Sequence, residues 1–366
     1  VTWPGHEGRS GIRIGADGKK NVVPNEGIGG NYWDLLPFGG EDALSTIYYY
    51  DAVLQMAGIE KAIRDHPEWT MPRSPDAFDA ADLLKHAAEV KAYSTQRFWN
   101  PATRRYGTVD LENAMHDYGF TFLNNEAVYY DFATPAQARD IRDWISGRRI
   151  VEGDTSTGND IYHWRFGPRS TTRRNVDYYF WGWSAPESIP FGNQVQDGGG
   201  VLGFSYHDLM ACLKVEGPNA AWRRLREITA WFDETQAAGG YRAYYKDPSR
   251  GTMQGGNVPG GLGLDREFFE SILVPQVMIY GFMGLRPSFD GLEIHPRLPD
   301  DWSSLGISRI HIRDHMVDVS VKEATVEIRS SIENAAGDQP LKIKIPAGWY
   351  LTNASPASLT LTITTR

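Results

Sequence analysis

Apolar residues recur three and four positions apart over most of residues 41–286, the spacing of helices that lie on a core. The first such segment, 41–65, has them at Leu44, Ile47, Tyr48, Val53 and Leu54. The same pattern predicts helices over 74–99, 111–130, 134–147, 202–215, 218–236 and 265–284. Ser74-Pro75 is expected to begin the second of these, with Ser74 as the cap.

After Pro287 the pattern changes from helical to alternating. Short runs in which apolar and polar residues alternate, as in half-buried strands, occur over 307–312, 316–321, 324–328, 341–345 and 359–365. The chain is therefore expected to be mainly α, with a small antiparallel β domain at its C-terminal end.

Long glycine-rich loops join the predicted helices, which favours an α/α toroid whose loops gather at one end of a helical barrel. About seven long helices are expected, fewer than a complete six-hairpin toroid contains. Either shorter helices escape the pattern, or a preceding chain segment or a homo-oligomer completes the barrel. The expected domains are a glycine-rich entry segment (1–40), a toroid region (41–286) and a β domain (287–366).

Composition narrows the class of protein. The chain is 41% hydrophobic and 23% charged, as in globular proteins, and every apolar run is too short to span a membrane. A net charge of -9 argues against nucleic acid or an anionic membrane as partner. The single cysteine, Cys212, excludes an internal disulfide. No His spacing indicates a metal site. The one ion that the sequence leaves open is a structural calcium bound by loop carboxylates. The start at Val1 predicts a processed or truncated chain.

The stretch 27–40 joins a glycine-rich loop to the first helix and brings Tyr32, Trp33 and Asp34 together. A carboxylate between aromatic rings is what a site for a neutral polyol, such as a sugar, would offer. The aromatic content of 12% agrees with sugar stacking, although large cores also use Trp and Tyr. The alternative is that Asp34 only caps or braces the turn.

Further candidates for substrate binding are polar groups inside apolar or glycine-rich segments. Asn125 and Glu126 lie in an otherwise apolar helix, so either sugar hydroxyls or an internal hydrogen-bond network must satisfy them. The remaining candidates are Trp181, Gln196, Asp197 and His207. The stretch 164–183 mixes arginines with aromatic rings, which indicates either an anionic-sugar site or Arg packed on rings as structure.

Several motifs resemble the six-hairpin (α/α)6 glycoside hydrolases, the group of glucoamylase-, trehalase-, α-glucosidase-I- and α-L-rhamnosidase-like enzymes. They are NYWDLLPFG at 31–39, QVQDGG at 194–199, EFFE at 267–270 and the tail at 280–299, and Asp197 stands where this group usually has Asn. The resemblance extends from Gly27 to the C-terminus. It implies a carbohydrate substrate, inverting hydrolysis, a C-terminal β-sandwich, and a periplasmic or secreted location.

Hydrolysis of a glycosidic bond needs a protonated carboxyl for the leaving oxygen and an ionised one to activate water. The resemblance implies that Asp34 is the general acid, and Glu270, near the other end of the helical region, is predicted as the general base. Glu267 competes with Glu270 because it lies three residues earlier on the same helix face. Alternatively, both glutamates are first-turn acids favoured by the helix dipole.

Three other functions stay open at this point. A glycoside phosphorylase would use phosphate in place of water, with the arginines of 165–174 as the candidate phosphate pocket. A polysaccharide lyase on an α/α toroid would abstract a proton beside a uronate. A non-catalytic sugar-binding chain, or one part of a nicked enzyme, is the third.

Overall fold

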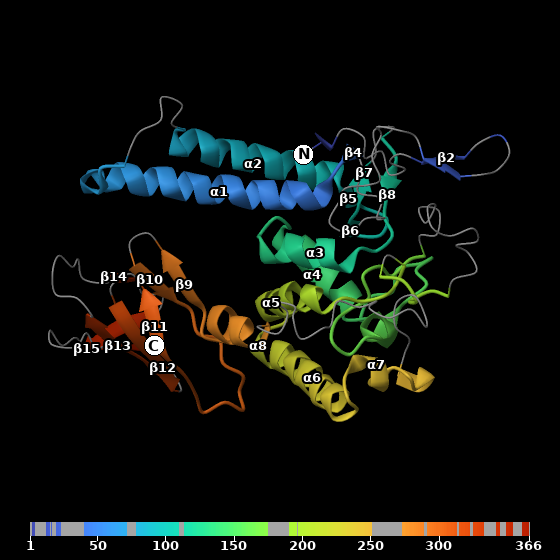
Figure 1. Ribbon diagram of the computed structural model, residues 1–366. Coiled ribbons are helices and arrows are strands. Elements are labelled where there is room, and N and C mark those ends of the chain that lie inside the picture. The colour runs from blue at the N-terminus through green and yellow to red at the C-terminus, as the bar shows by residue number, and fades with distance from the viewer. Residues whose placement is uncertain are drawn as a thin grey trace. The chain divides into compact units, whose positions relative to one another are not determined.

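The structure is a computed structural model that describes residues 2–3, 12–14, 16, 20–22, 40–71, 78–109, 113–174, 190–195, 197–250, 273–288, 291–312, 315–322, 325–332, 342–344, 349–353 and 361–365. The chain forms two compact units, Val1–Val215 with Leu225–Glu270, and Glu216–Arg224 with Ser271–Arg366. We call them the helical unit and the β unit after the elements that Figure 1 shows in each. A helical part followed by a β part is therefore established, in agreement with the sequence pattern.

Helices α1 (Ala43–Asp65) and α2 (Ala80–Arg97) lie side by side in the helical unit (Figure 1). Asp42 caps α1, because its carboxylate accepts the N–H groups of Leu44 at 2.8 Å and Ser45 at 3.2 Å. Asp79 caps α2 in the same way. This helix was predicted to start at Ser74, which lies outside the described residues. It starts instead after Asp79, which supplies the capping carboxylate, so the predicted start is wrong.

Four further helices follow the pattern of the sequence: α3 (Thr121–Tyr129), α4 (Pro135–Ile145), α5 (Ser205–Val215) and α6 (Pro218–Ala237). Helix α3 packs against both α4 and α5. Thr134 begins α4 with a capping box, as its position before Pro135 predicts. Between α5 and α6, Gly217 adopts φ +91°, which ends one helix and allows the turn into the next.

The predicted helix over 111–130 is too long. The described residues form a helix only from Thr121, and Met115–His116 is strand β8. Asn113 and Gly119 have φ of +66° and +68°, so the backbone leaves the right-handed helical region on both sides of β8. At Gly119 a side chain would also collide, because a Cβ would lie 2.0 Å from the Thr172 hydroxyl.

Short strands accompany the helices. The order β1-β4-β7-β8 makes one small sheet, and β2-β3 and β5-β6 are pairs. Their bounds are Thr2–Trp3 (β1), Ile12–Ile14 (β2), Lys20–Val22 (β3), Gly40–Glu41 (β4), Trp99–Asn100 (β5), Arg105–Tyr106 (β6) and Thr108–Val109 (β7). The short helices are η1 (Pro67–Trp69), η2 (Gly158–Tyr162), η5 (Leu202–Phe204), α7 (Tyr241–Tyr244) and η6 (Pro248–Arg250).

The last predicted helix, 265–284, is described only from residue 273. The described part consists of α8 (Leu273–Gln276) and a π-helix, η8 (Val277–Phe282), and α8 is not described before residue 273. The wider turn is visible in the bond from the N–H of Met283 to the carbonyl of Met278, five residues earlier.

The described residues of the β unit contain two sheets, besides α8, η8 and the start of α6. One has the order β14-β10-β9 and the other β11-β12-β13-β16-β15. Leu292 and Ile294 of the first share one apolar cluster with Val317 and Val319 of the second, so the sheets pack as a sandwich. The strands are β9 (Leu285–Ser288), β10 (Gly291–Ile294), β11 (Ser304–Ile312), β12 (His315–Lys322), β13 (Thr325–Ile332), β14 (Lys342–Lys344), β15 (Trp349–Asn353) and β16 (Leu361–Thr365).

One strand pair departs from the antiparallel expectation. β14 pairs with β10 in parallel, whereas the other described pairs are antiparallel. Three strands of the second sheet intervene between β10 and β14, and such a long connection allows the chain to return in the same direction.

Strand β11 contains a bulge at which Ser308 and Arg309 together oppose Asp318. Arg309 has φ +61°, and its N–H donates to the Asp318 carboxylate at 2.7 Å. Glycine adopts this conformation without a Cβ penalty, so we expect Arg309→Gly to stabilise the β unit by about 0.5–1 kcal/mol in urea unfolding. Arg309→Ala is the matched control, since it removes the same charge and keeps the Cβ. Equal stability of the two variants would contradict the conformational explanation.

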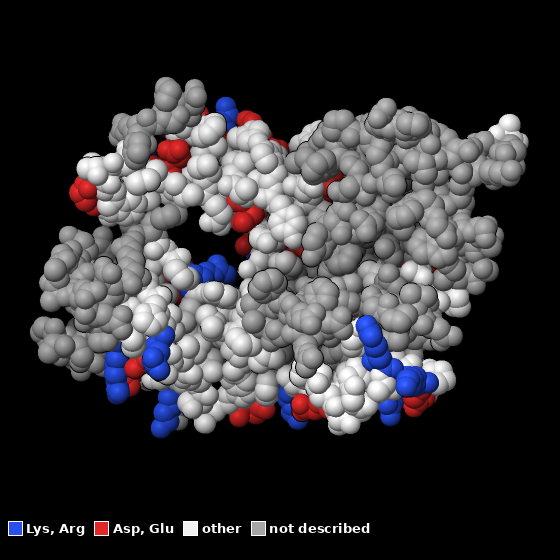
Figure 2. All heavy atoms as spheres, in the orientation of Figure 1, with Lys and Arg blue, Asp and Glu red and all other residues white. Residues whose placement is uncertain are grey.

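No described helix is both long and apolar enough to cross a membrane. On the face shown in Figure 2, the described acidic and basic side chains are interspersed. Neither sign of charge forms a large continuous area among the described residues there.

Candidate active site

The predicted site residues divide into two groups. Asn125, Glu126, Asp197 and His207 belong to the described part of the helical unit. The others lie outside the described residues, so their roles stay predictions: Tyr32, Trp33, Asp34, Trp181, Gln196, Glu267 and Glu270.

Helix α3 carries three consecutive buried polar residues, and the first of them is structural. The Asn124 amide accepts the N–H of Tyr106 at 2.8 Å and donates to the carbonyl of Tyr106 at 3.0 Å. Both ends of its side chain are thereby used to fasten α3 to strand β6.

Asn125 of α3 belongs to a buried network that joins four helical elements. Arg142 of α4 donates from Nη1 to the Asn125 amide oxygen and to Asp208 Oδ1 of α5, both at 2.7 Å. Tyr162 of η2 donates to the same Asp208 oxygen at 2.8 Å. Arg142 and Asp208 balance each other's charge in a place that water does not reach, which fixes α4 and α5 relative to α3.

Sequence analysis did not single out Arg142, although a signal was present. Its neighbours on the inner face of α4 are the buried Ile141, Trp144 and Ile145. A charged residue on the apolar face of a helix needs a buried partner of opposite charge. The position of Arg142 on this face of α4 therefore indicated a buried ionic network.

Glu126 is the third polar residue of α3 and differs from the other two. It is 4% exposed, and its Oε1 lies 3.5 Å from Nδ1 of His207 at the start of α5. Its other oxygen, Oε2, is buried and has no hydrogen-bond partner among the described residues. A buried carboxyl with one unused oxygen is unusual in a protein interior and points to a functional group.

Tyrosine rings surround His207. The centroids of Tyr129, Tyr130 and Tyr206 lie 5.0, 5.7 and 5.3 Å from the imidazole centroid. Burial and the charge of Glu126 raise the pKa of Tyr130 above its usual value, so this phenol stays neutral over the ordinary pH range. With the side chain of His207 19% exposed, the imidazole is the accessible member of its pair with Glu126.

Asp197 lies in a tightly bonded turn. Its backbone N–H donates to the carbonyl of Gln194, and the carbonyl of the next residue, Gly198, accepts bonds from Arg169 at 2.6 Å and Trp164 at 3.2 Å. The Asp197 carboxylate is buried and lies 3.7 Å from Nε of Arg174. Hydrogen bonds therefore hold the backbone at Asp197 and Gly198, and the Asp197 carboxylate faces a cation.

Of the described arginines in the stretch 164–183, three are paired with carboxylates and the fourth, Arg173, is exposed. Arg165 donates to Glu234 at 2.6 Å, and Arg169 forms an ion pair with Asp160 at 3.1 Å. These contacts agree with the structural alternative for the stretch rather than with an anion site. In the described part of the chain no group of three or more His, Cys, Asp or Glu side chains is placed to hold a metal ion.

A second buried ionic cluster lies around Arg105 of β6. Its guanidinium donates from Nε to Asp117 and from Nη1 to Asp154, both at 2.6 Å, and lies over the ring of Trp144 at 4.7 Å. The Arg105 side chain has no exposed surface. The cluster braces the segments that carry α3 and α4, and no local pattern predicted it because its members come from separate parts of the chain.

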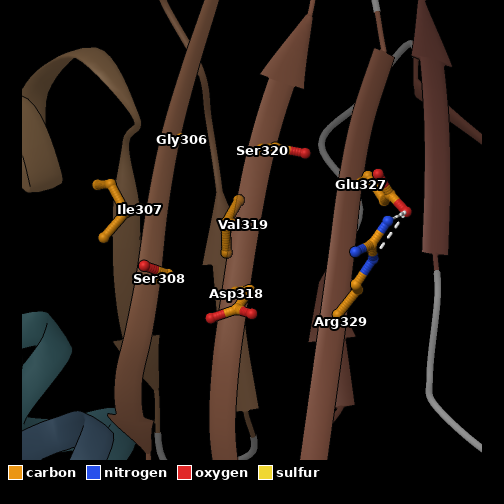
Figure 3. Close-up of a pocket in the computed structure, with 8 residues that line it drawn as sticks. All are labelled: Gly306, Ile307, Ser308, Asp318, Val319, Ser320, Glu327 and Arg329. Atoms are coloured by element: carbon orange, nitrogen blue, oxygen red, sulfur yellow. Dashed lines mark hydrogen bonds and ion pairs between the residues drawn. The ribbon is translucent and has the colours of Figure 1, made fainter.

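The β unit has a shallow groove of about 280 Å³. Figure 3 shows the residues of β11, β12 and β13 that line it: Gly306, Ile307, Ser308, Asp318, Val319, Ser320, Glu327 and Arg329. Arg329 donates twice to Glu327, and Asp318 holds the bulge of β11. Because its charged groups already have partners and no aromatic ring lines it, we do not assign this groove to the active site.

Comparison with known families bears on the β unit. Residues 285–347, from β9 through β14, match the family model described as "Glycosyl hydrolase family 65, C-terminal domain". That family belongs to the six-hairpin glycosidases, so the match supports a relation of this chain to glycoside hydrolases and phosphorylases. It indicates a carbohydrate-active enzyme. A comparison with curated proteins gave no match.

Proposed function

We propose that the chain cleaves glycosidic bonds in an oligo- or polysaccharide by hydrolysis, with two carboxyl groups as acid and base and with inversion at the anomeric carbon. The observation that carries this proposal is the match of residues 285–347 to a domain of glycoside hydrolases. The buried carboxyl group of Glu126 in the helical unit, with one oxygen that has no hydrogen-bond partner among the described residues, supports the proposal further.

In this proposal Asp34 protonates the leaving oxygen and Glu270 activates water, with Glu267 as the competing base. Tyr32, Trp33, Trp181 and Gln196 are proposed to bind the sugar together with the described Asn125, Glu126, Asp197 and His207. We further infer that α1 to α6 belong to an α/α toroid, because they are paired helices joined by long excursions.

The second candidate function is a glycoside phosphorylase, because the family match is compatible with both reaction types. A phosphorylase needs a cationic pocket for phosphate. Of the arginines at 165–174, which the sequence offers for it, Arg165, Arg169 and Arg174 are paired with Glu234, Asp160 and Asp197. Phosphate would have to displace these carboxylates, and this cost favours hydrolysis.

The distinguishing experiment follows the product in the presence and absence of inorganic phosphate. A panel of aryl glycosides and plant and bacterial oligosaccharides is incubated with the protein, and the products are identified by NMR. We expect free sugar of inverted anomeric configuration at a rate that phosphate does not change. A sugar 1-phosphate would establish the phosphorylase instead.

Two other outcomes of this experiment would contradict hydrolysis. An unsaturated product that absorbs in the ultraviolet would identify a lyase. Failure to turn over any substrate in the panel would contradict catalysis by this chain alone and favour a sugar-binding role or a second polypeptide.

A further inference from the structure

The smaller sheet of the β unit, β14-β10-β9, has one apolar and one polar face (Figure 1). Apolar residues of all three strands pack into the cluster between the two sheets: Leu285, Leu292, Ile294 and Ile343. Because side chains alternate along a strand, the residues between these lie on the outer face of the sheet. The described outer residues are mostly charged: Arg286, Glu293, His295 and Lys344.

Strand register aligns three of these outer residues across the sheet. Glu293 of β10 lies directly opposite Arg286 of β9 on one side and Lys344 of β14 on the other. Neighbouring strands are about 4.8 Å apart, so the backbone positions of the two cations are about 10 Å from each other. Lys344 Nζ lies 3.0 Å from one oxygen of Glu293, whereas Arg286 is exposed and forms no ion pair with a described carboxylate.

Backbone hydrogen bonds continue this face beyond the end of β10. The N–H of His295 donates to the carbonyl of Gly284 at 3.0 Å, and the N–H of Arg297 donates to that of Phe282 at 2.8 Å. The two-residue alternation therefore places the exposed His295 and Arg297 on the same side as Glu293. We call Arg286, Arg297 and Lys344, with Glu293 among them, the basic row.

The two arginines of the basic row act on a common neighbour. Burial and the positive charges of Arg286 and Arg297 lower the pKa of His295, while the charge of Glu293 opposes them. Like Arg286, Arg297 forms no ion pair with a described carboxylate. Two exposed guanidinium groups therefore lie close to one imidazole, and guanidinium binds carboxylates through two parallel N–H groups.

The charge balance of the β unit permits an anion to approach the basic row. The chain has a net charge of -9, but the β unit contains as many basic as acidic residues, so the excess negative charge belongs to the helical unit. A ligand with carboxylates is therefore not repelled by the net charge of the β unit, and it is attracted locally by the basic row.

The basic row suits a sparsely charged chain better than a densely charged one. Duplex DNA carries one negative charge per about 1.7 Å of its axis, so several phosphates would lie within the width of the row and meet Glu293. A polymer of uronic acids carries a single carboxylate on each sugar ring. Its carboxylates can lie at the cations while its hydroxyl groups donate to Glu293.

We propose that the basic row binds a polysaccharide whose sugar rings carry carboxylates, and that the outer face of β14-β10-β9 is an accessory binding surface. The inference goes beyond the proposed function, because binding at this surface requires no bond cleavage. All four residues of the row lie within the segment 285–347 that matches the carbohydrate-active family, and this favours a polysaccharide over other polyanions.

The test titrates the full chain into a fluorescently labelled oligogalacturonate and follows binding by fluorescence anisotropy. We expect Arg286→Gln and Arg297→Gln each to weaken binding about threefold, and the double variant about tenfold, because each change removes one exposed ion pair. Added salt should weaken binding to the wild type. Equal affinity of the double variant and the wild type, or no binding to either, would overturn the proposal.

Matched controls separate charge from other effects. Arg329→Gln removes an exposed arginine of the same unit that is already paired with Glu327, so it should leave the affinity unchanged. Glu293→Gln should tighten binding, because it removes the carboxylate of the basic row. The methyl ester of the same oligogalacturonate keeps the sugar rings without their charge, so it should bind the wild type and the double variant equally.

Two comparisons make the result specific. Duplex DNA that binds more tightly than the oligogalacturonate at equal salt, through the same arginines, would assign the surface to nucleic acid and overturn the proposal. Arginine-dependent binding in a protein that hydrolyses none of the substrate panel would contradict only the proposed function. Hydrolysis without any binding of the oligogalacturonate would contradict only this inference.

Discussion

Replacing Arg105 by methionine should lower the free energy of unfolding by about 3–5 kcal/mol. The guanidinium is fully buried and is the hydrogen-bond partner of Asp117 and Asp154, whose side chains are 5% and 1% exposed. Without it, two carboxylates stay buried close together with no cation between them. Methionine keeps much of the apolar volume that packs over Trp144, so the loss should come mainly from charge.

Urea unfolding followed by circular dichroism measures this loss, and Arg104→Met is the matched control. Arg104 is the neighbour in sequence, half exposed, and pairs with Asp140 at 3.0 Å, so its replacement should cost less than about 1 kcal/mol. Adding Asp117→Asn and Asp154→Asn to Arg105→Met should recover part of the stability. Equal effects of Arg105→Met and Arg104→Met would show that the buried cluster contributes no more than a surface pair.

The second large effect concerns the proposed catalytic carboxyls. Asp34→Asn and Glu270→Gln should each lower kcat by about 10²–10⁴-fold, since each removes a proton donor or acceptor from the transition state. The two losses should differ with the substrate. An aryl glycoside with an acidic leaving phenol needs little protonation, so Asp34→Asn should retain much of its rate there, while Glu270→Gln should not.

Kinetics on one natural oligosaccharide and one activated aryl glycoside provide the measurement. Glu267→Gln decides between the two neighbouring glutamates, because the true base should show the larger loss on both substrates. Glu41→Gln is the control, since Glu41 of β4 pairs with Arg97 at the end of α2 and its replacement should leave kcat unchanged. Full activity in Asp34→Asn on both substrates would remove Asp34 from the mechanism and direct attention to Glu126.

The elements that the sequence predicted well are those with local causes. α4 begins at Thr134 because that residue and Gln137 satisfy each other's backbone groups within one turn. β12 alternates buried Val317, Val319 and Val321 with exposed residues, and this period is visible in the sequence itself. The C-terminal tail, which resembled the six-hairpin glycosidases, is also the segment that matches one of their domains.

The errors arose where a tertiary contact overrides local preference. The apolar spacing of 111–120 resembles a helix, but Asn113 and Gly119 turn left-handed and Met115–His116 pairs with β7 instead. Strand β14 was predicted to be antiparallel to its neighbour. It pairs in parallel with β10, which the long connection between the two strands allows. The partner of β14 is far away in the chain, whereas β7 is close to β8 in sequence and the distant contact there is that of Gly119 with Thr172.

Local sequence therefore specified the helical and β parts of this protein, most of their helices and strands, and the residue types suited to sugar chemistry. It specified Glu126 and His207 as separate candidates on different helices. Only the tertiary structure brought them within 3.5 Å, set them in a group of tyrosine rings, and fixed their helices through Arg142 and Asp208. Propensity and period act over one or two turns of chain, whereas the pairing of buried charges depends on which helices pack together.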